Sequence, residues 1–246
     1  MKPPIEIAFF PGPNELLVGP VPRVVGTLTS LARPFPAPRQ KLPCDVVEVR
    51  LDKAGVAPDW LERCLAIEKR GWPVLLTIRL RKEGGAWAGG DAKRYPIFEK
   101  ALFELAGADV EWRSKIAYPV SILAKRKRKV CVISYHDFEK TPPVGELEAI
   151  VGEIQEMASI VKIATRLNSA DDEEVLRYLL TRKWKRPLCV IGMGPKWTHT
   201  RVLFPKLGSC LAYGYLDHAT APGQMSAAEL TRQLAGEKAA AVNAAI

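Results

Sequence analysis

The sequence is poor in the residues from which metal sites and disulfide frameworks are built. It contains three histidines and five cysteines in 246 residues, and no two cysteines are spaced as C-x-x-C. An odd, scattered set of thiols within apolar runs is typical of small buried side chains rather than of disulfides or a metal cluster. We therefore expect no metal site. The cysteines are Cys44, Cys64, Cys131, Cys189 and Cys210.

Long apolar runs are also absent. No stretch approaches the ~18 residues that a membrane-spanning helix needs. Prolines interrupt the N-terminal sequence MKPPIEIAFFPGPNELLVGP, so it lacks the continuous apolar segment of a secretory signal. These absences predict a cytoplasmic protein without a membrane partner.

Acidic residues are outnumbered by basic ones. The 36 Lys and Arg against 27 Asp and Glu give a formal net charge of +9, in a chain that is 48% hydrophobic. This is the composition of a folded globular protein, and its charge fits either a nucleic acid or a small anionic ligand. The one dense basic run, Lys125–Lys129, has no interleaved aromatic residue and no nucleic-acid motif. We interpret it as a solvated helix end.

Short β-type segments recur along the chain, with helical patterns between most of them. Segments such as VLLTI and VCVIS are apolar throughout, as in strands covered on both faces. Pro143–Ala158 places its apolar side chains on one helical stripe, and S-x-x-[DE] capping-box spacings begin at Ser169 and Ser226. The predicted strands are Arg23–Ser30, Asp45–Asp52, Pro73–Leu80, Asp109–Ser114, Lys129–Phe138, Ile160–Arg166, Leu188–Gly194 and Leu211–Leu216.

This alternation of strands and helices predicts an α/β fold with a parallel sheet. Eight strands favour closure into a (β/α)8 TIM barrel over an open doubly wound sheet. No shift in composition divides the chain, so we expect one domain over residues 1–246. The first crossover is unusual, because residues 31–43 read LARPFPAPRQKLP and contain four prolines. We expect an irregular connection there instead of a first helix.

Charged side chains collect where the predicted strands end, which is where barrel enzymes keep their chemistry. In DVVEVRLD, the side chains of Glu48, Arg50 and Asp52 share one face of the second strand. Three such charges are costly to desolvate unless they pair with one another or bind a ligand. This motif alone therefore leaves a structural ion-pair network and a binding site as open alternatives.

The third and fifth strands also end in polar residues. TIRLRKEGG carries Arg79 and then Glu83 directly before Gly84-Gly85, although a glycine pair also marks ordinary turns. VCVISYHDF places His136 at a carboxyl end. A lone histidine is often a bystander, but at this position it could transfer protons near neutral pH.

Lys162 is out of place inside the apolar sixth strand, IVKIATR. Its stem could extend the ammonium group to the rim of the barrel. We favour the alternative, a desolvated lysine that is neutral often enough to attack a ketone and form a Schiff base. Further along, Arg201 precedes the segment Ala219–Gln224, whose small residues and Pro-Gly pair suit a mobile lid.

Taken together, these segments resemble the type I 3-dehydroquinate dehydratases, the Schiff-base dehydroquinases of the shikimate pathway. The resemblance covers the chain from about Val24 to Leu234, and the motifs run in the order found in that family. Each motif is weak alone, and their order carries the assignment. They are EVRLD (Glu48–Asp52), TIRLRKEGG (Thr77–Gly85), SYHDFEKTP (Ser134–Pro142), VKIA (Val161–Ala164), the MG…TR segment (Met193–Arg201) and ATAPGQ (Ala219–Gln224).

The resemblance implies a role for each matching residue. Lys162 would form the imine, His136 would be the general acid/base, and Glu83 would orient it. The remaining residues would bind the substrate. Arg201 would hold its carboxylate under a lid of Thr220 and Gln224, and Glu48, Arg50 and Arg79 would bind its ring hydroxyls. Thr27 would be the family's small hydroxyl residue on the first strand, and Met193 and Tyr213 would form an apolar wall.

The same resemblance implies elimination of water from 3-dehydroquinate without a metal or organic cofactor. It leaves a homodimer open and assigns no role to His199. Thr220 stands where the family often has Ser, whose hydroxyl makes the same hydrogen bond.

Two rival functions stay open on the residues alone. A Schiff-base aldolase on the same barrel would use Lys162 to cleave a carbon–carbon bond, with Gly192 and Gly194 cradling a phosphate. The basic surface would alternatively bind nucleic acid, with an affinity that falls as salt rises. The arginine and the ATAPGQ segment favour a small carboxylate substrate and no nucleic-acid partner.

Overall fold

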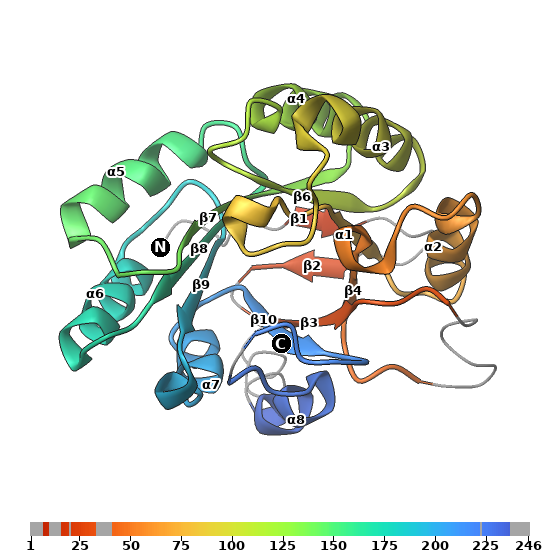
Figure 1. Cartoon of the computed structure of the whole chain (residues 1–246). Coiled ribbons are helices and arrows are strands. Elements are labelled where there is room, and N and C mark those ends of the chain that lie inside the picture. Colours follow the sequence, from red (N-terminus) through yellow and green to blue (C-terminus); the bar gives the residue numbers. More distant parts are fainter. Residues whose placement is uncertain (1–6, 10–15, 20, 33–40, 222, 237–246) are drawn as a thin grey trace.

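Eight parallel strands form the centre of the molecule in a computed structural model that describes residues 7–9, 16–19, 21–32, 41–221 and 223–236. The strand order is β10-β3-β4-β5-β6-β7-β8-β9, so each strand lies beside its neighbours in the chain and the sheet curves round upon itself (Figure 1). The strands are β3 (Arg23–Leu28), β4 (Val46–Arg50), β5 (Val74–Thr77), β6 (Gly107–Glu111), β7 (Val130–Asp137), β8 (Ile160–Arg166), β9 (Leu188–Met193) and β10 (Leu211–Tyr215).

The two edge strands, β9 and β10, meet at their amino ends. The backbone N–H of Cys210 donates to the carbonyl oxygen of Leu188 at 2.9 Å, and the N–H of Val190 donates to Ser209 Oγ at 2.9 Å. The sheet is therefore a nearly closed barrel. All eight predicted strands are present, and the prediction of a (β/α)8 barrel is confirmed.

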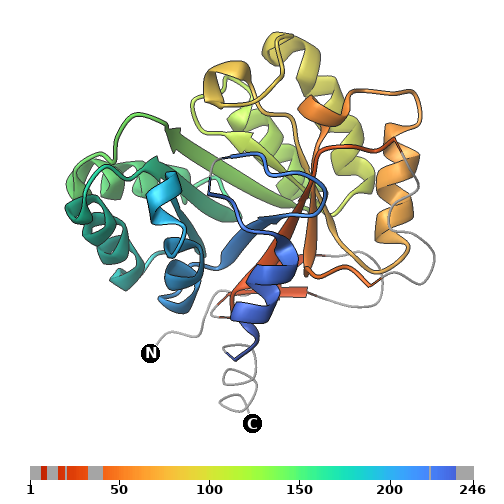
Figure 2. The ribbon, with the colours of Figure 1, turned by 60° about the horizontal axis from the view of Figure 1, so that its bottom comes forward.

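Helices surround the barrel (Figure 1). Ser169 caps one of them as predicted, in a capping box with Asp172, and Ser226 Oγ accepts from the N–H of Glu229 at the start of the last. In Figure 2 that last helix lies across the barrel wall, where Leu230 packs with Val24 of β3. The helices are α1 (Leu51–Ala54), α2 (Trp60–Glu68), α3 (Gly90–Glu104), α4 (Ala117–Arg126), α5 (Val144–Ile154), α6 (Ala170–Thr181), α7 (Thr200–Lys206) and α8 (Ala227–Gln233), with 3-10 turns η1 (Arg81–Glu83) and η2 (Pro195–Trp197).

A short antiparallel hairpin, which is not among the predicted strands, crosses the amino end of the barrel. It consists of β1 (Ile7–Phe9) and β2 (Leu16–Val18), seen across the barrel axis in Figure 1. Val18 packs into the apolar cluster that fills the amino-end half of the barrel (the lower barrel), beside Leu75 and Ile160. The amino end of the barrel is thereby sealed by apolar side chains, and the carboxyl end is left for polar ones.

Most predicted strand ends lie one to three residues away from those in the structure, and two of these differences change where charged side chains lie. The second stops at Arg50, because the chain turns directly into α1, which places Asp52 in a helix and not on the strand. The fourth is Gly107–Glu111 instead of Asp109–Ser114, because the N–H of Ser114 turns back to the carbonyl oxygen of Glu111. In the Pro-rich crossover 31–43, residues 31–32 and 41–43 form no helix, and 33–40 lie outside the described residues.

The scattered cysteines behave as small apolar side chains. Cys64, Cys131, Cys189 and Cys210 are buried in the apolar clusters or beside them. The basic run Lys125–Lys129 lies where α4 ends and β7 begins, as its interpretation as a helix end requires. Among the residues described, none of the helices combines the length and apolar character that crossing a bilayer requires.

Candidate active site

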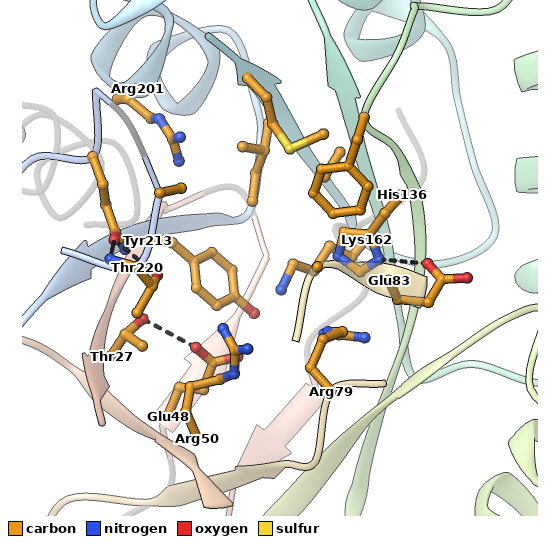
Figure 3. A pocket seen from close by; sticks show the side chains of 17 residues that line it. Thr27, Glu48, Arg50, Arg79, Glu83, His136, Lys162, Arg201, Tyr213 and Thr220 are labelled. Atoms are coloured by element: carbon orange, nitrogen blue, oxygen red, sulfur yellow. Dashed lines mark hydrogen bonds and ion pairs between the residues drawn. The ribbon is translucent and has the colours of Figure 1, made fainter. Parts of the chain in front are cut away.

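A polar pocket opens at the carboxyl ends of the barrel strands (Figure 3). All twelve residues predicted to form the site line this one pocket, although they come from places between Thr27 and Gln224 in the chain. Five further lining residues were not predicted. The twelve are Thr27, Glu48, Arg50, Arg79, Glu83, His136, Lys162, Met193, Arg201, Tyr213, Thr220 and Gln224; the five are Gly84, Phe138, Ala164, Ile191 and Ala221.

Lys162 projects from β8 into the barrel and does not extend to the rim. The residue is 5% exposed, whereas its neighbours Val161 and Ile163 alternate to the helix-facing side and pack in the outer core. Its Nζ lies 3.0 Å from Asp109 Oδ2 and 3.9 Å from the centroid of the Tyr213 ring. The ammonium group is therefore buried between a carboxylate and an aromatic face, and the rim alternative is wrong.

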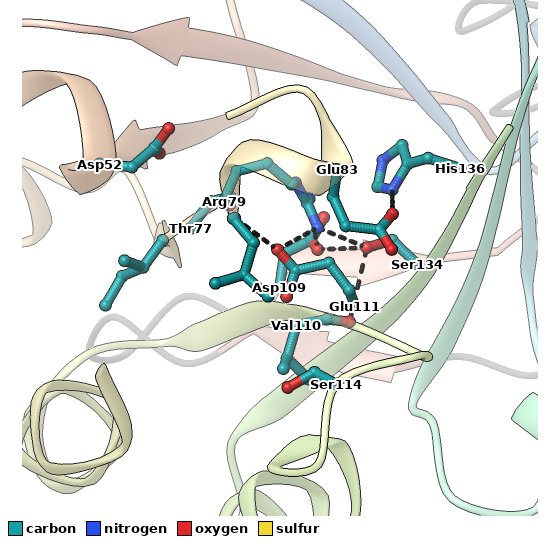
Figure 4. A network of polar contacts seen from close by, with 12 residues as sticks. Asp52, Thr77, Arg79, Glu83, Asp109, Val110, Glu111, Ser114, Ser134 and His136 are labelled. Carbon is teal, nitrogen blue, oxygen red and sulfur yellow. Dashed lines mark hydrogen bonds and ion pairs between the residues drawn. The ribbon is translucent and has the colours of Figure 1, made fainter. Parts of the chain in front are cut away.

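Asp109 on β6 holds two cations of the pocket together. Its Oδ1 lies 2.7 Å from Arg79 Nη2, its Oδ2 faces Lys162, and Ser134 Oγ donates to Oδ1 at 2.7 Å (Figure 4). Burial acts to raise the pKa of Asp109, but the charges of Arg79 and Lys162 outweigh it and lower the pKa well below its usual range. Asp109 is therefore a carboxylate at every working pH.

A second buried carboxylate, Glu111, lies behind this group. Its Oε1 accepts from the N–H of Leu80 at 3.0 Å and lies 3.4 Å from Arg79 Nη1. Its Oε2 lies 2.6 Å from Nη1 of Arg94, a fully buried arginine that also donates to the carbonyl oxygen of Ile78. The interior of the upper barrel is thus a network of alternating charges, and its geometry fixes the guanidinium of Arg79.

Neither of these carboxylates is among the residues predicted from the sequence, although the sequence carries a signal for them. In GADVE, Asp109 and Glu111 lie at i and i+2 and therefore point to the same side of a strand. The same spacing relates Glu48 and Arg50 on the second strand.

His136 and Glu83 lie together on the wall of the pocket. His136 Nδ1 is 3.3 Å from Glu83 Oε2, which leaves Nε2 on the side of the ring toward Lys162 (Figure 3). Burial and the charges of Arg79 and Lys162 lower the pKa of His136 well below its usual value of 6.5. The imidazole is therefore neutral at neutral pH and able to accept a proton. Burial, with the charge of Glu111, raises the pKa of Glu83.

The turn that carries Glu83 depends on its two glycines. Gly84 has φ +73°, a conformation that side chains rarely adopt, and a Cβ there would meet the ring of Phe138 at 2.6 Å. A Cβ on Gly85 would overlap the carbonyl oxygen of Arg79. Phe138 in turn stacks on His136, with ring centroids 5.8 Å apart and planes at 10°. The glycines therefore bring the Glu83 turn up against the histidine.

Glu48 and Arg50 form the opposite side of the pocket. Glu48 accepts hydrogen bonds from Thr27 Oγ1 at 3.0 Å and from Thr77 Oγ1 at 2.8 Å, which fixes both of its oxygens. Arg50 donates from Nε and Nη2 to the two oxygens of Asp52, each at 2.9 Å. Asp52 does not line the pocket and positions Arg50 from behind. The motif is both an ion-pair network and part of the pocket.

Arg201 differs from the other arginines of the pocket. Within the described part of the chain, no carboxylate lies within ion-pairing distance of it, and burial lowers the pKa of its guanidinium. In the same pocket, the amide oxygen of Gln224 accepts hydrogen bonds from the N–H and Oγ1 of Thr220, at 2.6 and 2.9 Å. Pro222 of the predicted lid lies outside the described residues. A half-buried guanidinium without an acidic partner among the described residues is a ready site for an anion.

Other candidates from the sequence lie outside the pocket. Gly192 and Gly194 do not line it, and the space a Cβ would take is filled by Leu167 and Trp197 respectively. His199 Nε2 lies 2.8 Å from Glu173 on the surface. In the ranges that the structure covers, no three His, Cys, Asp or Glu side chains are grouped to hold a metal ion.

Known proteins resemble this chain along most of its length. The family model described as type I 3-dehydroquinase matches residues 36–239. The 3-dehydroquinate dehydratase of Methanocella arvoryzae is 36% identical over 214 residues, which is 87% of this chain and 95% of that protein. That of Methanocaldococcus jannaschii is 34% identical over 190 residues, 74% of this chain and 82% of the other.

A solved structure shares the architecture as well. The 3-dehydroquinate dehydratase from Enterococcus faecalis matches with a TM-score of 0.74 and 27% identity, covering 87% of this chain and 93% of that one. The Thermotoga maritima 3-deoxy-D-arabino-heptulosonate 7-phosphate synthase, at 10% identity and a TM-score of 0.59, shares the fold alone.

Proposed function

The chain belongs to the type I 3-dehydroquinase family, and we propose that it dehydrates 3-dehydroquinate to 3-dehydroshikimate through a Schiff base on Lys162. The observation that carries this proposal is the position of Lys162 Nζ, which is buried at the centre of the pocket beside a neutral histidine. The reaction is the third step of the shikimate pathway of aromatic amino acid biosynthesis, and we place the enzyme in the cytoplasm.

The charges of the pocket can hold this substrate in one orientation. Arg201 would bind the carboxylate through two parallel hydrogen bonds, and Gln224 and Thr220 would close over it. Glu48, Arg50 and Arg79, whose positions are fixed by their own partners, would bind the ring hydroxyls. Met193 would pack against the ring. Held at both ends, the ring would present its ketone carbon to Lys162.

Imine formation requires a neutral amine and a route for its proton. His136 is close enough to Lys162 for the charge of the lysine to lower its pKa, and in its neutral form it can take up that proton. Nζ then attacks C3, and the carbonyl electron pair moves to oxygen, which takes one proton from Nζ and one from His136. The C–O bond breaks as the nitrogen lone pair forms the C=N bond, and the oxygen leaves as water. The product is a protonated imine, which Asp109 and the face of the Tyr213 ring would stabilise.

Elimination then follows from the electron-withdrawing imine. His136 removes a proton from C2, and the C–H electron pair moves toward the imine nitrogen to give an enamine. The same histidine returns the proton to the hydroxyl on C1, which leaves as water while the C1–C2 double bond forms. Water finally hydrolyses the imine and releases Lys162. Since the lysine supplies the electron sink, this mechanism needs no cofactor.

Glu83 would position the histidine through these transfers. Its carboxylate faces Nδ1, so it would hold the ring with Nε2 toward the substrate and would stabilise the imidazolium that forms after proton abstraction. The raised pKa of Glu83 is consistent with a carboxyl group that gains a favourable partner only when His136 becomes charged.

Replacement of the lysine tests the proposal. Lys162→Met should abolish formation of the conjugated enone product, measured by its ultraviolet absorbance, while circular dichroism shows an intact fold. Lys140→Met is the matched control, because Lys140 is an exposed lysine on the loop after β7 and does not line the pocket. Turnover by Lys162→Met at the rate of the control would refute a Schiff base at this residue.

A further inference from the structure

Tyr213 carries a buried hydroxyl group that the mechanism above does not use. The residue is 5% exposed, and its Oη has no hydrogen-bond partner among the described residues. The buried hydroxyls in and next to the pocket are otherwise paired, since Thr27 and Thr77 donate to Glu48 and Ser134 donates to Asp109. Buried polar atoms without partners are rare in folded proteins and call for an explanation.

The position of Tyr213 shows what could satisfy this hydroxyl. Its ring projects from β10 into the pocket, with Lys162 Nζ over its face at 3.9 Å, and its hydroxyl end points toward Glu48 and Arg50 (Figure 3). Burial, together with the negative charges of Glu48 and Asp109, raises the pKa of Tyr213 well above its usual value. The phenol therefore stays protonated and offers a hydrogen-bond donor.

Glu48 supplies the complementary acceptor on the same side of the pocket. Each of its two oxygens accepts one hydrogen bond from a threonine, and an ionised carboxylate has lone pairs for further bonds. A group placed between the phenol and the carboxylate must accept one hydrogen bond and donate another. An alcohol hydroxyl meets both requirements.

We propose that Tyr213 is a specificity-determining residue whose Oη donates a hydrogen bond to the C4 hydroxyl of 3-dehydroquinate, while that hydroxyl donates to Glu48. This inference rests on the proposed function, which brings the ketone carbon C3 to Lys162. C4 is bonded to C3, so its hydroxyl lies next to the imine, and the Tyr213 ring likewise lies beside the imine nitrogen. Tyr213 is then more than the apolar wall predicted from the sequence.

The arrangement discriminates against rings that lack this hydroxyl. Such a ligand would leave both the phenol and one side of the carboxylate without partners inside a buried site, and sites built to bind a hydroxyl reject analogues without it. The selected substrate class is a cyclic β-hydroxyketone with a second hydroxyl on the carbon adjacent to the ketone. The C4 hydroxyl does not leave in the reaction, so its contribution is to binding and orientation.

Kinetics of Tyr213→Phe with matched ligands test the proposal. The variant should lower kcat/KM for 3-dehydroquinate about five- to tenfold, mainly through KM, as expected for one lost hydrogen bond. The second ligand is 3-dehydroquinate that lacks the C4 hydroxyl. If this analogue is turned over, its KM should agree within twofold between the variant and the unmodified enzyme. If it is not turned over, its competitive inhibition constant should agree within twofold. The analogue lacking the C5 hydroxyl should retain the full difference.

Tyr135→Phe is the matched control. It removes a hydroxyl from another buried tyrosine that faces the helices and does not line the pocket, and it should leave all three ligands unaffected. An equal loss for Tyr213→Phe with every ligand would show a merely structural role and overturn the proposal. The proposal would also be overturned if the variant lost nothing with 3-dehydroquinate, or if the difference disappeared for the analogue lacking the C5 hydroxyl. Failure of the Schiff-base mechanism would appear instead as turnover by Lys162→Met.

Discussion

The charge balance beneath the pocket predicts that Asp109→Asn destabilises the fold strongly. The substitution keeps the size of the side chain and removes one negative charge. Arg79 and Lys162 then remain as two buried cations, and Arg79 keeps a neutral hydrogen bond to Ser134 and the more distant carboxylate of Glu111 at 3.4 Å. All of these side chains are 6% exposed or less, so water does not compensate for the lost carboxylate.

The expected loss is about 3–5 kcal/mol in the free energy of unfolding, the cost of breaking a buried ion pair by removing one partner. This is a large part of the ~5–15 kcal/mol by which domains are stable. Because the native pKa of Asp109 lies far below the ~3.9 of an unfolded aspartate, its contribution is complete at neutral pH and is lost as the pH falls below about 4. The deficit of the variant should therefore shrink in acid.

Urea unfolding at pH 7 and in acid measures these differences. Asp59→Asn is the matched control, because Asp59 pairs with Arg63 at 2.7 Å on the surface, where an ion pair contributes about 0–1 kcal/mol. Adding Lys162→Met to Asp109→Asn should recover stability by removing one unpaired cation. A loss for Asp109→Asn no larger than that of the control would refute the account of the buried network.

Three further predictions concern catalysis. His136→Ala should lower kcat by at least ~10²-fold in steady-state assays while borohydride still traps an imine, and a near-normal kcat would assign the proton transfer to another residue. Because the pKa of His136 is lowered and its neutral form is the base, the acid limb of the kcat/KM profile should lie below pH 6.5; a limb above that value would contradict this assignment. Arg201→Ala should weaken ligand binding by ~2–5 kcal/mol in calorimetry with little change in stability, since Arg201 has no acidic partner among the described residues. Arg201→Lys should not restore binding, and Gln224 should not close over the ligand in ligand-soaked crystals of the alanine variant.

The pocket could be predicted from the sequence because its residues lie at the ends of strongly patterned strands. Lys162 sits in a run that is otherwise apolar, and His136 follows the apolar run VCVI at the carboxyl end of its strand, so both are visible in the sequence. Eight parallel strands bring all their carboxyl ends to one face of a barrel, which is why residues as distant as Thr27 and Gln224 meet there. Strand patterning alone singled out Lys162, His136 and the charged residues of β4 and β5, whereas the other pocket residues came from the family resemblance. These others include Thr27, Met193, Tyr213, Thr220 and Gln224.

The supporting layer was harder to predict, because it depends on contacts that no local pattern specifies. Arg94 lies on α3 and reaches Glu111 of β6 only after the helix packs on the barrel. The end of β4 at Arg50 is set by the turn into α1, which turns Asp52 back onto Arg50. The hairpin of β1 and β2 gains its stability from packing against the lower barrel, so its two three-residue strands carry almost no signal of their own.

Trapping the imine on the intact enzyme tests the central claim most directly. The protein is incubated with 3-dehydroquinate and sodium borohydride, digested, and mapped by peptide mass spectrometry. The reduced adduct should appear on the peptide that contains Lys162 and on no other lysine, because Lys162 is the lysine that lines the pocket. An adduct on a different lysine, or no adduct in a preparation that turns over the substrate, would contradict the Schiff-base mechanism.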